Sequence, residues 1–367
     1  MAKIAIGIVG VGNCASSLLQ GLDFYRAGEQ ATAAEHSGLM HADVCGYRPS
    51  DLEVVCAFDV DRRKVGRPLH EAAMAPPNCT RPIHPKLSVS PVIVAMGPLL
   101  DGVSEHMADY PPDETFLPAE RAPVDVAAEL RRSGAKILVN YLPVGSQRAT
   151  EEYARACLEA GVAFVNCIPV FIASDPQWAA QFAQRRLPIV GDDIKSQLGA
   201  TIVHRMLAKL FVDRGVAIDN TYQLNVGGNT DFLNMLNRAR TQAKRVSKTE
   251  AVQSNLPTPL GREHIHIGPS DYVPFQRDNK LCFLRLEGRG FGNAPIELEL
   301  RLSVQDSPNS AGCVIDAVRC CQVALDRGLG GPLHAISSYV MKHPPRQLSD
   351  DLARDAVERF IRGEAER

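Results

Sequence analysis

The chain has 367 residues, a formal net charge of −2, and 45% hydrophobic and 22% charged residues. This length suffices for two domains, and the near-neutral charge gives no reason to expect nucleic acid or an acidic membrane as a partner. The apolar runs are far shorter than the roughly 20 residues of a membrane span, no signal peptide is evident, and the ten cysteines are scattered without a CxxC pair. We therefore expect a globular cytoplasmic protein with reduced thiols.

The first expected element is a short apolar strand at residues 3–9, followed by a glycine-rich turn and a helix at residues 16–25. The turn reads G-x-G-x-x-A: the first glycine permits a tight turn, the second lets backbone approach a pyrophosphate, and the small third residue lets the helix pack closely. A tight turn without a ligand is the alternative. At the first strand of an α/β pattern the motif favours a dinucleotide site, with cofactor-binding residues Gly10, Val11, Gly12, Asn13 and Cys14.

A second strand at residues 52–58 ends at Asp59, and residues 25–50 before it read as an insertion. An acid at this strand tip can bind ribose hydroxyls and repels a 2′-phosphate, which favours NAD over NADP. Arg62, Arg63 and Lys64 follow at once and argue the other way. We expect these three on the next helix, facing solvent, and therefore predict NAD.

Residues 66–90 and 98–124 are rich in proline and read as loops around a short strand at residues 92–96. Repeated βα units then predict a doubly wound parallel sheet with right-handed crossovers. Its strands are expected at residues 136–141, 163–167 and 187–190, and its helices at 146–160 and 176–185. Ligands bind beyond the carboxyl ends of such strands, so residues 140–143, 166–169 and 191–193 should share one rim with the glycine-rich turn.

The turn at residues 191–197 precedes an amphipathic helix at residues 201–214. It carries Asp192, Asp193 and Lys195, and free N–H groups at a helix N-terminus favour an anion such as phosphate. A capped helix start with solvated charges is the alternative. One face of the helix collects apolar residues, namely Ile202, Met206, Leu207, Leu210 and Phe211.

The second half begins with an alternating strand at residues 221–226, and two further strands are expected at 281–286 and 295–304. Alternation indicates one buried face, as in an antiparallel sheet, and the last strand could equally face a partner subunit. A long apolar helix at residues 311–327 is a candidate to return and cover the first sheet, and residues 349–362 are expected to form a surface helix. His264 and His266 share a strand face without a third ligand, so no metal site is predicted, and His204 reads as structural.

Together the motifs resemble the myo-inositol-1-phosphate synthase family in its shorter bacterial form, over residues 8–345. The matching blocks are IVGVGNCASS, FDVD, YLPVGS, VFIASDP, GDDIKSQLGAT, LNVGGNTDFLN, KRVSKTEAVQSN, HIGPSDYV, LRLEGRGFG, DSPNSAG and SYVMKHPP. The resemblance implies a Rossmann-type α/β fold with an inserted α+β domain for catalysis and tetramerisation. The NAD-binding domain would be residues 1–197, the insertion 198–305, and the return to the first domain 306–367.

The implied activity is the NAD-dependent isomerisation of D-glucose 6-phosphate to 1L-myo-inositol 1-phosphate, a first step toward inositol and its phospholipids. C5 is oxidised, C6 is deprotonated, the enolate attacks the C1 aldehyde, and the inosose is reduced. The family is homotetrameric, and whether this member needs a divalent or monovalent cation stays open. The alternatives are a net NAD-dependent dehydrogenase of a small phosphorylated or semialdehyde substrate, with Cys167 as its only candidate thiol, and a non-catalytic NAD sensor.

Such chemistry needs a base beside a hydride acceptor, positive charge for an enolate, and cations for a phosphate. By the resemblance, Lys342 acts on the C5 hydroxyl, Lys280 and Lys244 stabilise oxyanions, and Lys248 holds phosphate. Asp193 orients a lysine, and Asp306 lies near the nicotinamide. The substrate residues implied are Ser196, Gln197, Gly199, Thr201, Asn225, Asn229, Asp231, Lys244 and Lys248. The further cofactor residues are Tyr141, Leu142, Pro143, Asp193, Ser196, Asp231 and Asp306.

Overall fold

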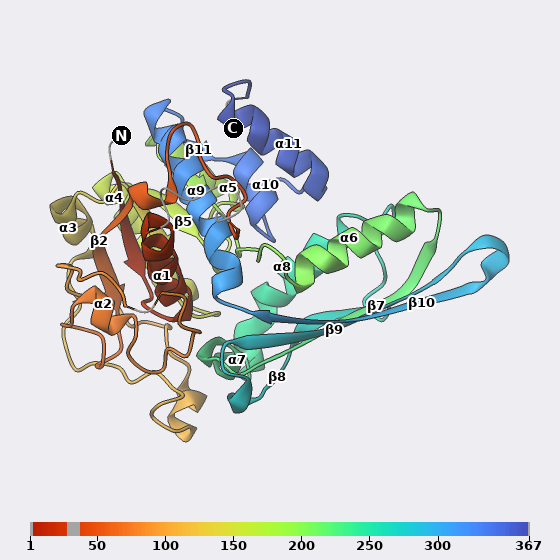
Figure 1. Ribbon diagram of the computed structural model, residues 1–367, viewed down its shortest axis with the longest axis horizontal. Helices are drawn as coiled ribbons and strands as arrows, with labels where there is room; N and C mark the ends of the chain where they lie inside the picture. The colour runs from red at the N-terminus through yellow and green to blue at the C-terminus, as the bar shows by residue number, and fades with distance from the viewer. Residues whose placement is uncertain (1–2, 28–36, 85, 366–367) are drawn as a thin grey trace.

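The computed structural model describes residues 3–27, 37–84 and 86–365, which form two sheets with their helices (Figure 1). The larger sheet has seven strands in the order β11-β6-β5-β4-β1-β2-β3, and every neighbouring pair is parallel. The doubly wound parallel sheet is thereby confirmed. Its strands are β1 (Ile4–Val9), β2 (Leu52–Asp59), β3 (Ala95–Met96), β4 (Ile137–Asn140), β5 (Ala163–Asn166), β6 (Pro188–Val190) and β11 (Gly331–Pro332).

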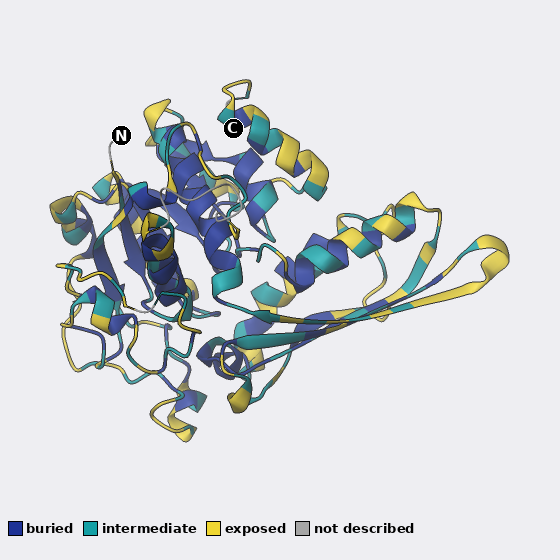
Figure 2. Ribbon diagram, viewed as in Figure 1, coloured by how far each residue is buried: buried dark blue, intermediate teal, exposed yellow. Residues whose placement is uncertain are grey.

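Helices cover both faces of this sheet, so its central strands are buried throughout (Figure 2). One face packs against α1 (Asn13–Ala27), α9 (Pro308–Asp326), α10 (His334–Val340) and α11 (Asp350–Ile361). The other face packs against α3 (Val126–Ser133), α4 (Gln147–Ala160) and α5 (Pro176–Gln184). The expected return of the long helix near residue 311 to the first sheet is confirmed by its place in this core.

The smaller sheet has the order β10-β9-β7-β8, and α6 (Ala200–Asp213) and α8 (Gln242–Gln253) pack against it. Its strands are β7 (Ala217–Gly227), β8 (Ile265–Tyr272), β9 (Asn279–Arg289) and β10 (Pro295–Gln305). The antiparallel pairing expected from the alternating strands holds for β9 with β7 and with β10, whereas β8 runs parallel to β7. The short helices α2 (Leu69–Ala72) and α7 (Thr230–Asn234) lie in connecting segments.

The apolar stripe expected on α6 is buried only in part, and Leu207 of this stripe packs against the core of the smaller sheet. Phe211 is buried, but Met206 and Leu210 are 51% and 50% exposed. The helix instead turns His204, Arg205 and its small residues inward. His204 bonds to Thr221 and Gln223 of β7, which confirms its structural role and explains the orientation.

The basic segment after β2 also differs from the prediction. Residues 62–66 form turns, and the next helix, α2, begins only at Leu69. Lys64 is 1% exposed, and its Nζ donates to the Val11 carbonyl at 2.7 Å and to Asn78 at 2.9 Å. Arg63 pairs with the buried Asp61. The prediction failed because the carbonyl of the glycine-rich turn points inward and needs a buried donor.

Part of the expected insertion lies outside the described residues, at 28–36. The described stretch at residues 38–47 lies along α9, where Arg319 donates to the carbonyls of His41, Ala42 and Tyr47. Within the described ranges, no helix is long and apolar enough to cross a membrane.

Candidate active site

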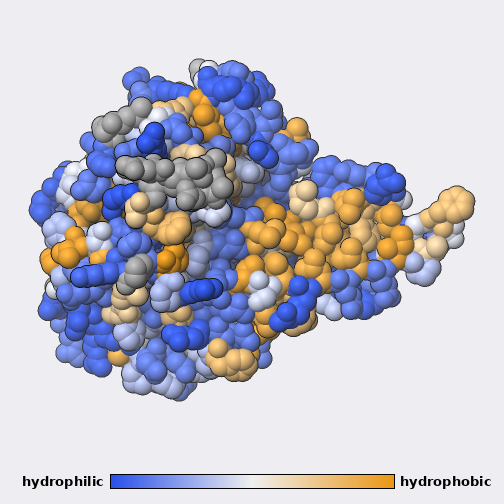
Figure 3. Space-filling model, viewed as in Figure 1, coloured by the Kyte–Doolittle hydropathy of each residue, from blue (hydrophilic) through white to orange (hydrophobic). Residues whose placement is uncertain are grey.

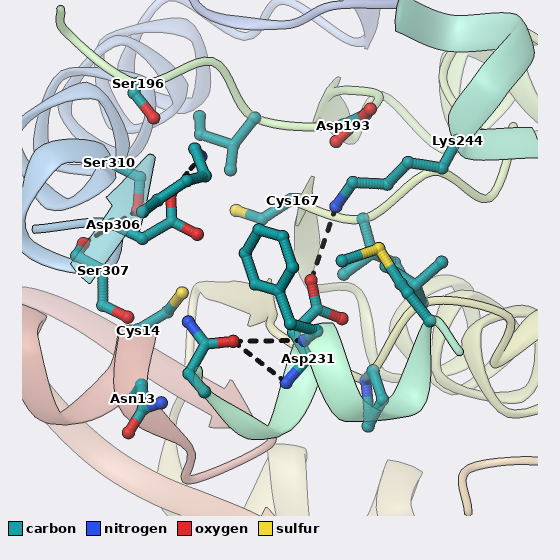
Figure 4. Close-up of a pocket in the computed structure, with 18 of the residues that line it drawn as sticks. Asn13, Cys14, Cys167, Asp193, Ser196, Asp231, Lys244, Asp306, Ser307 and Ser310 are labelled. Carbon is teal, nitrogen blue, oxygen red and sulfur yellow. Dashed lines mark hydrogen bonds and ion pairs between the residues drawn. The ribbon is translucent and has the colours of Figure 1, made fainter. Parts of the chain in front are cut away.

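One cavity lies where the carboxyl ends of the parallel strands meet the smaller sheet (Figure 4). The rim predicted from the βα units is present, because the glycine-rich turn and the segments after β4, β5 and β6 all reach it. The predicted residues that line it are Gly12, Asn13, Cys14, Tyr141, Leu142, Pro143, Asp193, Ser196, Gly199, Thr201, Asn225, Asn229, Asp231, Lys244, Lys248, Lys280, Asp306 and Lys342.

Hydrogen bonds between backbone amides and side-chain oxygens hold the glycine-rich turn in its conformation. Gly10 has φ +86°, and a Cβ there would lie 2.6 Å from the Tyr141 carbonyl oxygen, so only glycine fits. The Val11 amide donates to Asp59 at 2.7 Å, and Asn13 accepts from the Cys79 amide at 2.7 Å. A Cβ added to Gly12 would meet nothing within 4 Å, so the backbone faces open space there.

Three of the four predicted lysines are paired with carboxylates from other segments. Lys342 Nζ lies 2.9 Å from Asp193 Oδ1, and Lys244 Nζ lies 3.6 Å from Asp231 Oδ2. Lys280 forms an ion pair with Asp306. These pairs bring together side chains more than 10 residues apart in the sequence, and Figure 4 shows Lys244, Asp231, Asp193 and Asp306 around one space.

Lys248 is the exception in this group. In the described part of the chain, no carboxylate lies within ion-pairing distance of its ammonium, although the side chain is buried. Burial and the charges of Lys244, Lys280 and Lys342 lower the pKa of Lys248 to about 7. Burial also lowers the pKa of Lys342, against the opposing charge of Asp193. The site therefore holds one amine, that of Lys248, which exchanges protons near neutral pH.

Burial and nearby charges together determine the pKa values of the carboxylates in the cavity. Burial acts to raise the pKa of Asp193, but Lys342 and Lys244 outweigh it and leave the pKa below its usual value. The pKa of Asp306 is lowered in the same way, because Lys280 in particular outweighs the effect of burial. Asp278 is different: burial and the nearby Asp306 raise its pKa to about 6. It accepts from Asn229 and Ser307, so it links two walls of the cavity.

The start of α6 provides the expected anion-binding features. Gly199 precedes the helix, and a Cβ at this position would lie 2.7 Å from Ser196 Cβ, so the turn needs glycine. Ser196, Thr201 and Lys248 line the same cavity. Free N–H groups, hydroxyls and an ammonium together suit a phosphate dianion.

Several predicted residues do not face the cavity. Gln197 donates its side-chain amide to the Gly38 carbonyl at 2.7 Å and packs on α9. Gly10 and Val11 belong to the glycine-rich turn but do not line the cavity, and Asp59 lies beneath the turn, where both of its oxygens accept backbone N–H bonds. From the turn before α6, Asp192 accepts from residues 172–174 and Lys195 pairs with Asp350, so neither reaches the cavity.

The sequence reasoning missed Phe116, Gln223, Ser307 and Ser310, which also line the cavity. Ser307 and Ser310 had a visible signal, because both lie with Asp306 in one matching block. Cys167 lines the cavity, but burial holds its pKa well above the ordinary thiol value. All ten cysteines lie in the described part of the chain and are free thiols. Among the described residues, no three His, Cys, Asp or Glu side chains are placed to hold a metal ion.

These features define an α/β protein with a Rossmann-type sheet and a lysine–carboxylate cluster at its ligand-binding edge. The chain is 53% identical over 365 residues to the inositol-3-phosphate synthase of Mycolicibacterium smegmatis, with 98% of each chain covered. It is 52% identical over 363 residues to the inositol-3-phosphate synthase of Mycobacterium tuberculosis, covering 98% of this chain and 96% of the relative.

A sequence profile described as Myo-inositol-1-phosphate synthase matches residues 199–307. The crystal structure of Ari2 matches the whole fold with a TM-score of 0.79 at 34% identity, covering 99% of this chain and 100% of that chain. The chain belongs to the myo-inositol-1-phosphate synthase family, as the sequence blocks predicted.

Proposed function

We propose that the protein converts D-glucose 6-phosphate into 1L-myo-inositol 1-phosphate, with NAD as its cofactor. The observation that carries the proposal is that one cavity, in a chain of this family, joins a glycine-rich dinucleotide turn to four lysines and three of their carboxylate partners. Positive charge next to a hydride acceptor suits a reaction that passes through an enolate.

The cofactor part of the proposal is supported by the fit of the glycine-rich edge. Gly12 leaves room for a pyrophosphate, and Asn13, Cys14 and Leu142 line the adjoining wall. NAD bound there supplies a hydride acceptor and, in the reverse sense, a hydride donor. Asp306 and Asp231 line the same cavity, and we place the reacting carbons beside them.

The lysines supply the proton chemistry and the charge. Lys342, as a neutral amine, takes the proton of the C5 hydroxyl, which its lowered pKa favours. Lys280 and Lys244 stabilise the oxygens that become negative as the enolate forms and attacks C1. Asp231 Oδ1 is buried and has no hydrogen-bond partner among the described residues, so it can accept from a substrate hydroxyl.

The phosphate is held by the start of α6 with Ser196, Gly199, Thr201 and Lys248. Asn225 and Asn229 line the side of the cavity next to them. Gln197 contributes by holding the loop against α9 and not by touching the phosphate.

We extend the proposal to the domains and the assembly. Residues 1–197 and 306–367 form the NAD-binding domain, supported by the presence of β11 in the larger sheet. Residues 198–305 form the inserted domain for catalysis and tetramer assembly. Figure 3 shows an apolar patch over α6 and the smaller sheet, and exposed apolar side chains of these elements include Met206 and Leu210 of α6 and Phe283 of β9; both observations support a homotetramer. Free thiols support a cytoplasmic location.

The test is to incubate purified protein with glucose 6-phosphate and a catalytic amount of NAD, following inositol phosphate and NADH in parallel. Product without net NADH supports the isomerase, and Lys280→Ala should abolish product while the exposed Lys136→Ala does not. Stoichiometric NADH would instead favour a net dehydrogenase. The buried thiol of Cys167, with its raised pKa, speaks against the thiol-dependent form of that alternative.

A further inference from the structure

Asp193 stands in an unusual backbone conformation at the centre of the cavity. Its φ is +64°, in the left-handed region that side chains other than glycine seldom adopt, and the residue is 1% exposed. Such a conformation persists only where surrounding contacts hold it. Two side-chain contacts act on the carboxylate: Lys342 donates to Oδ1 at 2.9 Å, and Ser247 donates to Oδ2 at 2.7 Å.

Ser247 comes from α8, the helix that also carries Lys244 and Lys248. Residues three and four apart lie on one helical face, so the hydroxyl points to the same side as the two lysines. Ser247 is fully buried, and its hydrogen bond joins α8 to the segment after β6. The bond therefore fixes the distance between two parts of the site that lie more than 50 residues apart in the sequence.

Lys342 contacts the carboxylate oxygen of Asp193 that Ser247 does not contact. Its ammonium donates to Asp193 Oδ1 at 2.9 Å and to the Ile194 carbonyl at 2.6 Å, while the side chain lines the cavity. Two of its three N–H groups are used by the protein, and the third remains for a ligand. The position of the amine therefore depends on the carboxylate that Ser247 holds.

We propose that Ser247 is a positioning residue that, through Asp193, fixes the orientation and proton affinity of the Lys342 amine. This role rests on the proposed function only because Lys342 is the base of the proposed reaction. The hydroxyl directs the positive end of its dipole at the carboxylate, which reduces the negative potential that Lys342 experiences. Without the hydroxyl, the carboxylate holds the ammonium proton more tightly, and its backbone conformation loses one of the contacts that maintain it.

Other charged and titratable groups also act on the Asp193–Lys342 pair. Those that face it from neighbouring elements are Lys244 and Lys248 of α8, Lys280 of β9, Asp306 before α9, and Cys167 after β5. None of them is altered by substituting Ser247, so a change in the titration of Lys342 reports on the hydroxyl.

The test compares Ser247→Ala with Ser247→Thr, which keeps a hydroxyl, and with Thr241→Val. Thr241 is buried immediately before α8 and bonds to the Arg238 carbonyl, so Thr241→Val removes a hydroxyl next to the same helix without touching Asp193. We expect kcat to fall roughly tenfold to a hundredfold in Ser247→Ala, with KM for glucose 6-phosphate within about twofold, and partial recovery in Ser247→Thr. The acid limb of the kcat–pH profile should move to higher pH.

A second measurement does not depend on turnover. Competitive labelling of amines across a pH series, read by mass spectrometry, gives the titration of Lys342 directly; its pKa should rise in Ser247→Ala and stay unchanged in Thr241→Val. An unchanged Lys342 titration in folded Ser247→Ala protein would overturn the proposal, as would an equal kcat loss in Thr241→Val. If the unsubstituted protein makes no inositol phosphate, the proposed function fails, while the labelling result still decides the role of Ser247.

Discussion

The two sides of the cavity satisfy their buried polar groups in different ways. At the glycine-rich turn, the partners are mainly backbone amides and carbonyls, as in the bonds of Asp59, Asn13 and Lys64. On the lysine side, the partners are opposite charges brought from separate segments, as in Lys342 with Asp193. Backbone N–H groups can receive the pyrophosphate of a cofactor, whereas a reaction that develops charge needs preorganised ions. Under the proposed function, the glycine-rich side binds the cofactor and the lysine side carries the chemistry.

The strongest test of this comparison is Lys342→Met. Removing the amine should lower product formation about 10³-fold, because a side chain positioned as a general base accelerates a reaction by a factor of this order. NAD affinity should stay within about twofold of the unsubstituted protein, since Lys342 lies on the lysine side. Turnover and NAD titration by fluorescence measure the two quantities. Lys209→Met, on the outside of α6, is the matched control, and a parallel loss of NAD affinity in Lys342→Met would contradict the division.

The next test concerns the junction of α6 with α11, outside the cavity, where the carboxylate of Asp350 pairs with the buried Lys195 and Arg205. Asp350→Asn leaves two buried cations without their counter-ion and should cost about 3 kcal/mol of unfolding free energy. Denaturant unfolding measures the loss. Asp351→Asn makes the same change at the exposed neighbouring residue and should have little effect. Equal stabilities of the two variants would show that the junction does not depend on this ion triad.

A smaller effect is expected from pH, through Lys248. Its pKa of about 7 means that the ammonium is charged below that pH and neutral above it. Because a phosphate dianion binds the charged form, KM for glucose 6-phosphate should rise up to about tenfold per pH unit above neutrality. Calorimetry in buffers of different ionisation enthalpy should detect proton uptake on binding at about pH 8. Lys248→Met should bind weakly at every pH and take up no proton; uptake that persists in this variant would assign it elsewhere.

The smallest expected effect comes from a change at the glycine-rich turn. Asn13→Ala removes one bond between the glycine-rich turn and Cys79, worth about 1 kcal/mol. NAD affinity should fall about fivefold, with kcat at saturating NAD unchanged within about twofold. Asn220→Ala, at the far end of β7, serves as the control. A fall in kcat as large as that of Lys342→Met would mean that both sides carry chemistry.

The local elements of the protein could be predicted from its sequence, because their signals are local. The apolar run before Gly10 predicts β1, and alternation predicts β9 and β10, each within a few residues of the observed ends. The order of βα units also predicts that the segments after β4, β5 and β6 share one edge, since parallel strands bring their carboxyl ends together. Most predicted residues therefore line one cavity.

Tertiary structure alone decided which side chains meet and which way they turn. Met206 and Leu210 of α6 face outward because His204 and Arg205 have partners on β7 and α11. Lys64 is buried because a carbonyl of a distant turn requires a donor, and Gln197 leaves the cavity to bond Gly38. Ser247 gave no signal of its own, since a serine in a helix is common until Asp193 is placed beside it. Periodicity fixes a residue's place along an element, but its direction depends on packing against segments remote in the sequence.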